Sequence, residues 1–410
     1  MTDTTSRAPV VGRLGRKEFI VLVAGLVAIN AFAIDIMLPG LQQIGASLGE
    51  ADPNKRQLVI PAYLLGFGLL QLVFGPLSDR FGRRGPLLVG LAVYCLAALC
   101  AFFTTNFSAL IALRLVQGGG AAASAVIATA LVRDVFAGNE MAKIMSLVFT
   151  VLMLSPILAP SLGQGLMTVM DWRGLFGFMA ALGLIIIAWV WWRLPETLQP
   201  EHRRPLSLRA VLEGFGIVFA NRVSLAYIIG MAALFGALMG FLNSSQQIYR
   251  DVFGVTTLFP VFFAGGAICS ALGGVVNAQL VNRFGMRKLS WVALAVFSAA
   301  ALVMLAAGLL QALPLALFFA LSAAQFLVFS MILSNFGALA MEPLGEVAGT
   351  AASTQGFLQM VPGAAIGILI GQMFNGTVVP MALGHVAMAG LTAVCLVTMA
   401  AEGRRGVGAT

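Results

Sequence analysis

Asp35 and Arg114 are the charged residues that lie deepest inside long apolar segments of this sequence. A lone carboxylate in a low-dielectric cavity beside a positive charge can take up and release a proton. An arginine at such depth in a membrane costs at least about 2.5 kcal/mol unless it faces water or a partner. Because the two residues lie at comparable depth, Asp35 is the candidate partner of Arg114. Together they predict proton coupling.

Long apolar helices must hold these two side chains. The 410 residues are 60% hydrophobic and 10% charged, whereas about a quarter of a soluble domain is charged. Apolar runs of about twenty residues recur along the chain, and each can cross a hydrocarbon core of about 30 Å. We therefore expect an all-α polytopic membrane protein with twelve transmembrane helices, at residues 16–39, 55–76, 85–104, 107–133, 140–167, 172–193, 222–248, 256–281, 288–309, 313–339, 346–373 and 379–400.

Both charged residues also have a simpler interpretation in a membrane. Asp35 is alternatively a solvated acid that caps the outer end of the first helix. Arg114 is alternatively a side chain whose stem lies in lipid while its head group reaches the outer interface. His385, in the last predicted span, is expected to be a packed histidine rather than a proton carrier.

The composition also argues against several other classes of protein. Cysteines occur only inside apolar runs and without paired spacing, so we expect neither disulfides nor a metal site nor a cofactor. The net charge of +8 is not gathered in a basic tract outside the membrane, so we expect no nucleic-acid partner. No Walker A pattern occurs, and two histidines with one buried acid do not make an enzyme site. The expected partners are a small-molecule substrate, protons and the lipid bilayer.

The distribution of basic residues predicts the orientation in the membrane. If the N-terminus is cytoplasmic, the loops on that side hold 19 of the 24 Lys and Arg residues, and the opposite loops hold four. Positive charge concentrates on the cytoplasmic side of membrane proteins. We therefore expect both termini in the cytoplasm and a location in a bacterial-style inner (plasma) membrane, with the first apolar run retained as a span rather than cleaved as a signal.

Two internal echoes divide the chain into halves. LVNRFGMR at 280–287 repeats LSDRFGRR at 77–84, and SQQI at 245–248 repeats LQQI at 41–44. Tandem repeats of this kind are the layout of transporters that rock around a central site. We therefore expect two pseudo-symmetric six-helix bundles and a linker between them, at residues 1–193, 222–410 and 194–221 respectively.

Several motifs carry a family resemblance. GPLSDRFGRR at 75–84 resembles the signature between helices two and three of the major facilitator superfamily. LRLVQGGGAAAS at 113–124 is similar to that family's fourth-helix motif, and SPILAPSLG at 155–163 to the fifth-helix motif of its drug antiporters. With IDIMLPGL at 34–41 and AGTAASTQGFLQ at 348–359, the chain resembles the twelve-helix drug:proton antiporters of the bicyclomycin and chloramphenicol resistance (Bcr/CflA) type. It departs from the pattern at Gln164, Asn282 and Met286, where the motifs have a glycine, an aspartate and an arginine.

The resemblance implies a function as well as a fold. It implies a monomeric secondary active transporter that exports drug-like molecules across the inner membrane in exchange for protons, by alternating access. Because that branch has a functional acid in helix one, the resemblance strengthens the interpretation of Asp35. The alternative is a proton-coupled exporter or importer of a specific metabolite or amino acid, which the same two charged residues would serve equally well.

The signature loop is interpreted as a conformational latch. Glycine permits close helix approach and unusual backbone angles, and the Asp79 carboxylate can lie against the positive end of a helix. By pseudo-symmetry, the partner is the start of helix eleven at 345–349. The alternative is a loop that only anchors the topology. The residues of the predicted latch are Gly75, Asp79, Arg80, Gly82, Arg83 and Arg84.

The remaining candidates concern a gate and a substrate cavity. Pro156, Pro160 and Gly163 predict a bent, closely packed helix five facing Pro362, Gly363 and Gly367 of helix eleven, with a static kink as the alternative. A surface of amides, Met and aromatic residues can bind flat, moderately apolar molecules. For each of these polar residues, the alternative is a hydrogen bond between neighbouring helices. The cavity candidates are Tyr63, Gln71, Phe149, Met153, Asn243, Gln246, Gln325, Gln355 and Gln359.

Overall fold

The computed structural model describes residues 14–136, 144, 155, 158–198, 201, 203, 208–255 and 258–407, and in residues 208–211, 214, 345–353 and 399–407 the backbone alone. Nearly all of this part of the chain is helical. Eleven of its helices are long and apolar enough to cross a membrane. They correspond to eleven of the predicted spans, while the twelfth prediction, residues 140–167, falls largely outside the described residues.

The helices follow one another with short connections. The first group comprises α1 (Arg16–Asp35), η1 (Leu38–Gly40), α2 (Leu41–Ser47), α3 (Pro53–Arg56), α4 (Val59–Phe81), α5 (Arg84–Phe103), α6 (Phe107–Val135) and α8 (Trp172–Arg193). The second comprises α9 (Leu208–Ala220), α10 (Arg222–Gln247), the π-helical turn η3 (Ile248–Val252), α11 (Phe259–Phe284), α12 (Met286–Leu309), α13 (Leu315–Met341), η4 (Glu342–Val347), α14 (Ala348–Gln372) and α15 (Val379–Val407).

Polar caps and glycines set the ends of these apolar helices. The side chain of Asn106 caps α6, and those of Asp171 and Asn221 cap α8 and α10 in the same way; each satisfies a backbone N–H that has no partner inside its helix. Gly82, with φ of 92°, and Gly285, with φ of 77°, follow α4 and α11. These two glycines occupy matching places in LSDRFGRR and LVNRFGMR, so the repeat in the sequence is also a repeat of backbone shape.

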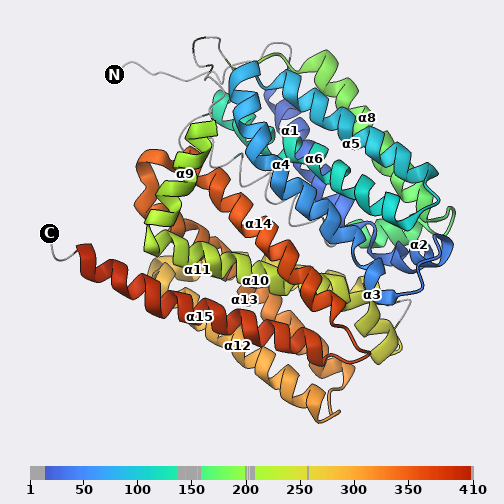
Figure 1. The fold of residues 1–410 in the computed structure, drawn as a ribbon, viewed down its shortest axis with the longest axis vertical. Coiled ribbons are helices and arrows are strands. Elements are labelled where there is room, and N and C mark those ends of the chain that lie inside the picture. The colour runs from blue at the N-terminus through green and yellow to red at the C-terminus, as the bar shows by residue number, and fades with distance from the viewer. Residues whose placement is uncertain are drawn as a thin grey trace.

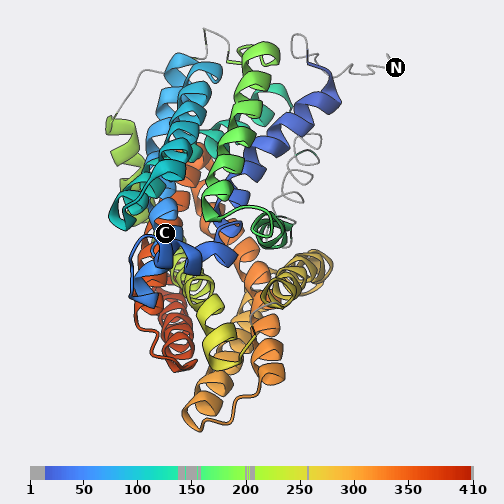
Figure 2. The same ribbon diagram turned by 90° about the vertical axis from the view of Figure 1, so that its right-hand side faces the viewer.

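The helices gather into two groups. Figure 1 shows α1, α4, α5, α6 and α8 lying together, and α10, α11, α12, α13 and α15 lying together below them; Figure 2 shows the same separation from the side. α14 packs against α10 of its own group and against α4 of the other. We call these the N-terminal and C-terminal helix groups.

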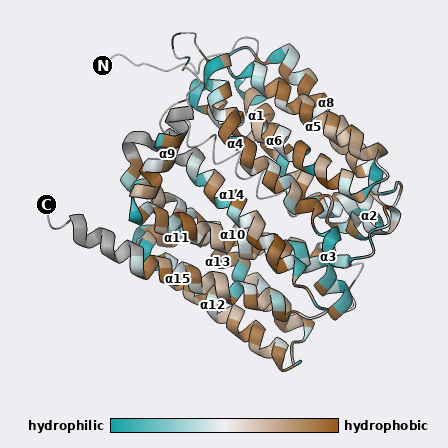
Figure 3. Cartoon of the chain, in the orientation of Figure 1, coloured by the Kyte–Doolittle hydropathy of each residue, from teal (hydrophilic) through white to brown (hydrophobic). Residues whose placement is uncertain are grey.

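The two groups are closest at one end of the molecule. In Figure 1 they meet near α3 and diverge toward the end where α9 and both termini lie. We call these the far end and the termini end. Figure 3 shows hydrophobic residues along the helix shafts and hydrophilic residues around α2 and α3, at the far end. This pattern fits helices whose middles lie in lipid and whose ends meet water.

Two expectations from the sequence differ from the structure. Residues 194–221 are not only a loop, because α9 lies within them; its Phe215 ring packs 5.6 Å from that of Phe357 on α14. Gly75 was expected to permit a close approach or an unusual turn. Instead it lies inside α4, and a Cβ atom there would meet nothing within 4 Å. The helix continues to Phe81, so only Gly82 makes the turn.

Candidate functional site

Arg114 is fully buried on α6, and neutral groups hold its guanidinium. Nη2 donates to the Ala33 carbonyl at 2.9 Å, and Nε donates to the Val59 carbonyl at 3.1 Å. Nη1 donates to Gln117 Oε1 at 2.8 Å, and the ring centre of Tyr63 lies 4.6 Å from Cζ. An aromatic face attracts a cation in this position. The arginine therefore faces inward and joins α6 to α1 and α4, which excludes the alternative of a head group at the interface.

Asp35 is the last residue of α1 and is 6% exposed. The expected pairing with Arg114 is wrong for this conformation, since the described residues contain no ion pair between them. The guanidinium instead takes the carbonyl of Ala33, which is among the last four carbonyls of α1 and so lacks a partner inside the helix. The acid is thus nearly buried, within two residues of an arginine contact, and unpaired by charge.

A line of buried polar side chains continues from Arg114 into the N-terminal group. The Tyr63 hydroxyl donates to Asn30 Oδ1 at 3.3 Å, and Asn30 Nδ2 donates to Ser124 Oγ at 2.8 Å. Tyr63, a cavity candidate from the sequence, is therefore enclosed within this group. Asn30 and Ser124 were missed by the sequence reasoning, although a lone amide within the apolar first span was the available signal.

A second polar cluster surrounds Arg83 at the termini end. Its Nε donates to Asp134 Oδ2 at 2.8 Å, and Nη1 donates to Asp79 Oδ1 at 2.6 Å and to Ser78 Oγ at 2.9 Å. Burial lowers the pKa of Arg83, but the hydrogen bonds and charges of Asp134 and Asp79 outweigh burial and hold that pKa above its ordinary value. The cluster joins the α4–α5 turn to the end of α6.

Glu196, which follows α8, completes this cluster. Its carboxylate accepts the backbone N–H groups of Arg83 at 2.7 Å and Arg84 at 3.2 Å, at the positive end of α5. A Cβ atom on Gly82 would lie 2.3 Å from Glu196 Oε2, so glycine is required there by space as well as by its positive φ. Sequence reasoning found Gly82 but missed Asp134 and Glu196, which lie far from the motif in the sequence.

The other latch residues have separate surroundings. The Arg84 guanidinium lies over the Trp191 ring and donates to the Trp191 carbonyl, while Arg80 is exposed beside Phe81. Asp79 is paired with Arg83 in this conformation. Its predicted contact with residues 345–349 stays a prediction, because the side chains there are outside the described set.

Replacing Arg83 with glutamine is expected to destabilise the fold by about 3–5 kcal/mol, because Asp134, which is 10% exposed, would lose its charge partner. Thermal unfolding of the purified protein in detergent measures this. The variant Arg80→Gln in the same loop is the control and is expected to change stability by no more than about 0.5 kcal/mol. Equal unfolding temperatures for the two variants would contradict the structural role of Arg83.

The predicted gate between helix five and helix eleven is not seen. A Cβ atom on Gly163 would lie 2.3 Å from the Ile36 carbonyl, so Gly163 packs against the end of the α1 segment. Gly363 and Gly367 pack against α10. Pro160 is buried, and Pro156 lies outside the described residues. These close contacts are therefore made within each helix group rather than between the groups.

The cavity candidates do not meet in one place. Gln325 binds His385 at 3.1 Å inside the C-terminal group, and the other ring nitrogen of His385 lies 3.1 Å from the Ala237 carbonyl. His385 is therefore a packed residue, as expected. Gln71 lies on α4 beside Gly356 of α14. Gln355 and Gln359 lie on α14 and are half-buried, whereas Phe149 and Met153 lie outside the described residues.

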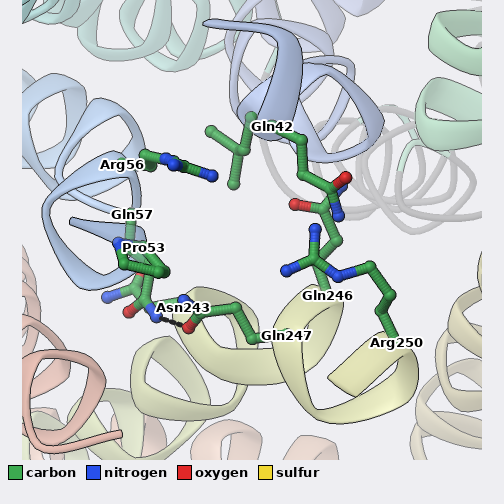
Figure 4. A pocket seen from close by; sticks show the side chains of 9 residues that line it. Gln42, Pro53, Arg56, Gln57, Asn243, Gln246, Gln247 and Arg250 are labelled. Carbon is green, nitrogen blue, oxygen red and sulfur yellow. Dashed lines mark hydrogen bonds between the residues drawn. The ribbon is translucent and has the colours of Figure 1, made fainter. Parts of the chain in front are cut away.

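The remaining candidates, Asn243 and Gln246, lie where the two groups meet at the far end. Figure 4 shows Gln246 and Arg250 pointing toward Gln42 and Arg56 across a narrow pocket. A neighbouring cavity of about 180 Å³ shares several of these residues. It is lined by Pro39, Gln42, Gln164, Met167, Gln246, Arg250, Val255 and Phe259. Both helix groups thus contribute amide and apolar surface to one site.

Comparison with known proteins gives matches along most of the chain. The profile of the Major Facilitator Superfamily matches residues 20–368. The bicyclomycin resistance protein homolog of Haemophilus influenzae is 30% identical over 366 residues, which cover 88% of this chain and 91% of that protein. Multidrug resistance protein D of Escherichia coli is 28% identical over 352 residues, covering 84% of this chain and 86% of that protein.

The fold also matches solved structures. The crystal structure of a D-xylose-proton symporter superposes with a TM-score of 0.72 at 15% identity, covering 93% of this chain and 97% of the symporter. At this identity the match concerns the fold alone. It agrees with the two helix groups and the long membrane-spanning helices described above.

Proposed function

This chain belongs to the Major Facilitator Superfamily, and from that premise we propose that it exports drug-like small molecules across the inner membrane in exchange for protons. It is a multi-pass membrane transporter whose relatives include bicyclomycin and multidrug resistance proteins. The proposal adds proton exchange and alternating access between two six-helix bundles, at residues 1–193 and 222–410, joined by the cytoplasmic linker 194–221.

The observation that carries proton exchange is the environment of Asp35 and Arg114. Arg114 is fully buried and keeps its charge on carbonyl, amide and aromatic partners, while Asp35 lies nearly buried close by with no ion pair. A carboxylate held near a fixed positive charge, but not neutralised by it, can exchange a proton when its access to water changes. This arrangement supports Asp35 as the proton carrier and Arg114 as the group that favours its ionised form.

The arrangement of the two helix groups supports alternating access. They are joined by hydrogen bonds at the far end and diverge at the termini end. The excess of Lys and Arg in loops of the termini end places that end in the cytoplasm. The structure then corresponds to the state that is open to the cytoplasm, and Asp79 of the α4–α5 turn would engage the start of α14 when that end closes.

The drug-like substrate class rests on the names of the relatives and on the mixed surface at the far end. Amide and arginine groups beside Met167 and Phe259 suit small molecules with both polar and apolar parts. A proton-coupled exporter or importer of a specific metabolite remains the second candidate, since the same charged residues would couple either substrate to protons.

Purified protein in liposomes under an imposed pH gradient tests the proposal. We expect proton release that depends on added compound, for at least several members of a panel of cationic, neutral and anionic drugs. A pH indicator trapped in the liposomes measures it, and protein-free liposomes are the control. Proton flux with a single metabolite and none of the drugs would favour the second candidate, and no flux with any compound would contradict proton coupling.

A further inference from the structure

We propose that Asn54 is the gate residue that keeps the outer end of this transporter closed, by capping α14 from the opposite helix group. The inference rests on the alternating-access transport proposed above, with the far end as the outer end. It concerns a contact that the Asp35 and Arg114 chemistry does not use. Neither the sequence motifs nor the named relatives assign any role to this asparagine.

The contact is reciprocal and runs between the two helix groups. Asn54 Nδ2 donates to the carbonyl of Gln372 at 3.0 Å and to the carbonyl of Phe374 at 2.9 Å. In return, Gln372 Nε2 donates to the Asn54 carbonyl at 2.6 Å. Three hydrogen bonds therefore connect α3 of the N-terminal group to the end of α14.

The end of α14 needs such a partner. The last carbonyls of a helix have no intrahelical donor, and they carry the negative end of the helix dipole. Asn54 supplies an uncharged amide donor to the Gln372 carbonyl, which closes the last turn of α14. The short helix α3 presents this amide from a fixed place, because the Asp52 side chain caps its start and Pro53 begins it.

Neighbouring amides extend the same contact. Gln247 Nε2 donates to Asn54 Oδ1 at 3.4 Å, and Gln57 is hydrogen-bonded to Gln247. Gln246 Nε2 donates to the Pro39 carbonyl at 3.3 Å. In the part of the chain that the structure describes, every hydrogen bond between the groups at this end joins neutral groups. Such bonds exchange readily for water, so this closure can form and break in each transport cycle.

A single substitution separates the gate from the rest of the fold. Asn54→Asp keeps the size of the side chain but sets a carboxylate oxygen against two carbonyls at the negative end of α14. Asn375→Asp is the matched control. It also adds a negative charge at the far end, and its exposed side chain contacts Thr377 alone, to which an aspartate can still offer an acceptor.

The experiment measures distances between spin labels by double electron–electron resonance, on cysteine-free protein in lipid. One label pair, Thr105→Cys with Ala312→Cys, spans the far end, and another, Trp192→Cys with Asn282→Cys, spans the termini end; all four sites are exposed. With Asn54→Asp, we expect the ratio of outward-open to inward-open protein to rise by about tenfold, as fits buried carbonyls left unpaired. The far-end distance lengthens and the termini-end distance shortens.

The controls fix the interpretation. Asn375→Asp should leave both distances as in the unsubstituted protein, and Asn54→Ala should shift them in the same direction as Asn54→Asp but less. If Asn54→Asp fails to fold, Asn54→Ala carries the test. Unchanged distances in a folded Asn54 variant would overturn the gate, as would an equal shift in Asn375→Asp. Because the distances are measured without substrate, a failure to observe proton-coupled transport would leave this result independent.

Discussion

Replacing Asp35 with asparagine is expected to abolish proton-driven transport while leaving a folded protein. The amide has the same shape but cannot take up or release a proton. Because Asp35 makes no ion pair among the described residues, its loss leaves no buried charge behind, and Arg114 keeps its three hydrogen bonds. We expect the rate of drug-dependent proton release in liposomes to fall by about 100-fold or more, as when a positioned proton-transfer group is removed.

The control for this variant is Asp171→Asn. Asp171 is also an aspartate near the far end of the chain, but it is exposed and caps α8 through the backbone N–H of Arg173. Asparagine caps a helix about as well as aspartate, so transport and stability should both persist. Proton-driven transport by Asp35→Asn at the unsubstituted rate would reject Asp35 as the carrier. Exchange of drug for drug that survives without proton release would instead separate substrate movement from proton coupling.

The sequence predicted the parts of this molecule that depend on local pattern. Runs of apolar residues identified eleven of the helices within a few residues, and the glycine of each repeated loop marked a turn with positive φ at Gly82 and Gly285. Burial of Arg114 also followed from elementary cost, because a charge at depth must face inward. Each of these properties depends on the residue and its near neighbours in the chain.

Contacts between distant segments were much harder to predict. Asp134 and Glu196 meet Arg83 only because α6 and the chain after α8 both reach the α4–α5 turn. Likewise, the Ala33 carbonyl competes with Asp35 for Arg114 only because α1 ends there. A backbone carbonyl has no letter in the sequence, so side-chain pairing rules named the wrong partner. Glycines present the same difficulty, since their value depends on what lies opposite.

That dependence makes Gly118→Ala the substitution with the largest expected effect on stability. A Cβ atom at Gly118 would lie 1.9 Å from the Tyr63 carbonyl oxygen, and one at Gly66 would lie 1.9 Å from the Leu115 carbonyl oxygen. Reciprocal glycines of this kind let α4 and α6 approach backbone to backbone. Because a backbone carbonyl cannot rotate away as a side chain can, the helices must separate. The separation would also stretch the Arg114 bond to the Val59 carbonyl.

Gly75→Ala on the same helix is the matched control, because a Cβ atom there meets nothing within 4 Å and alanine favours a helix over glycine by about 1 kcal/mol. The two substitutions add the same methyl group, yet we expect Gly118→Ala to lower the unfolding temperature in detergent strongly and Gly75→Ala to leave it equal or raised. Equal unfolding temperatures would mean that α4 and α6 are not in backbone contact. Arg114 would then have to be held by groups other than those of α4.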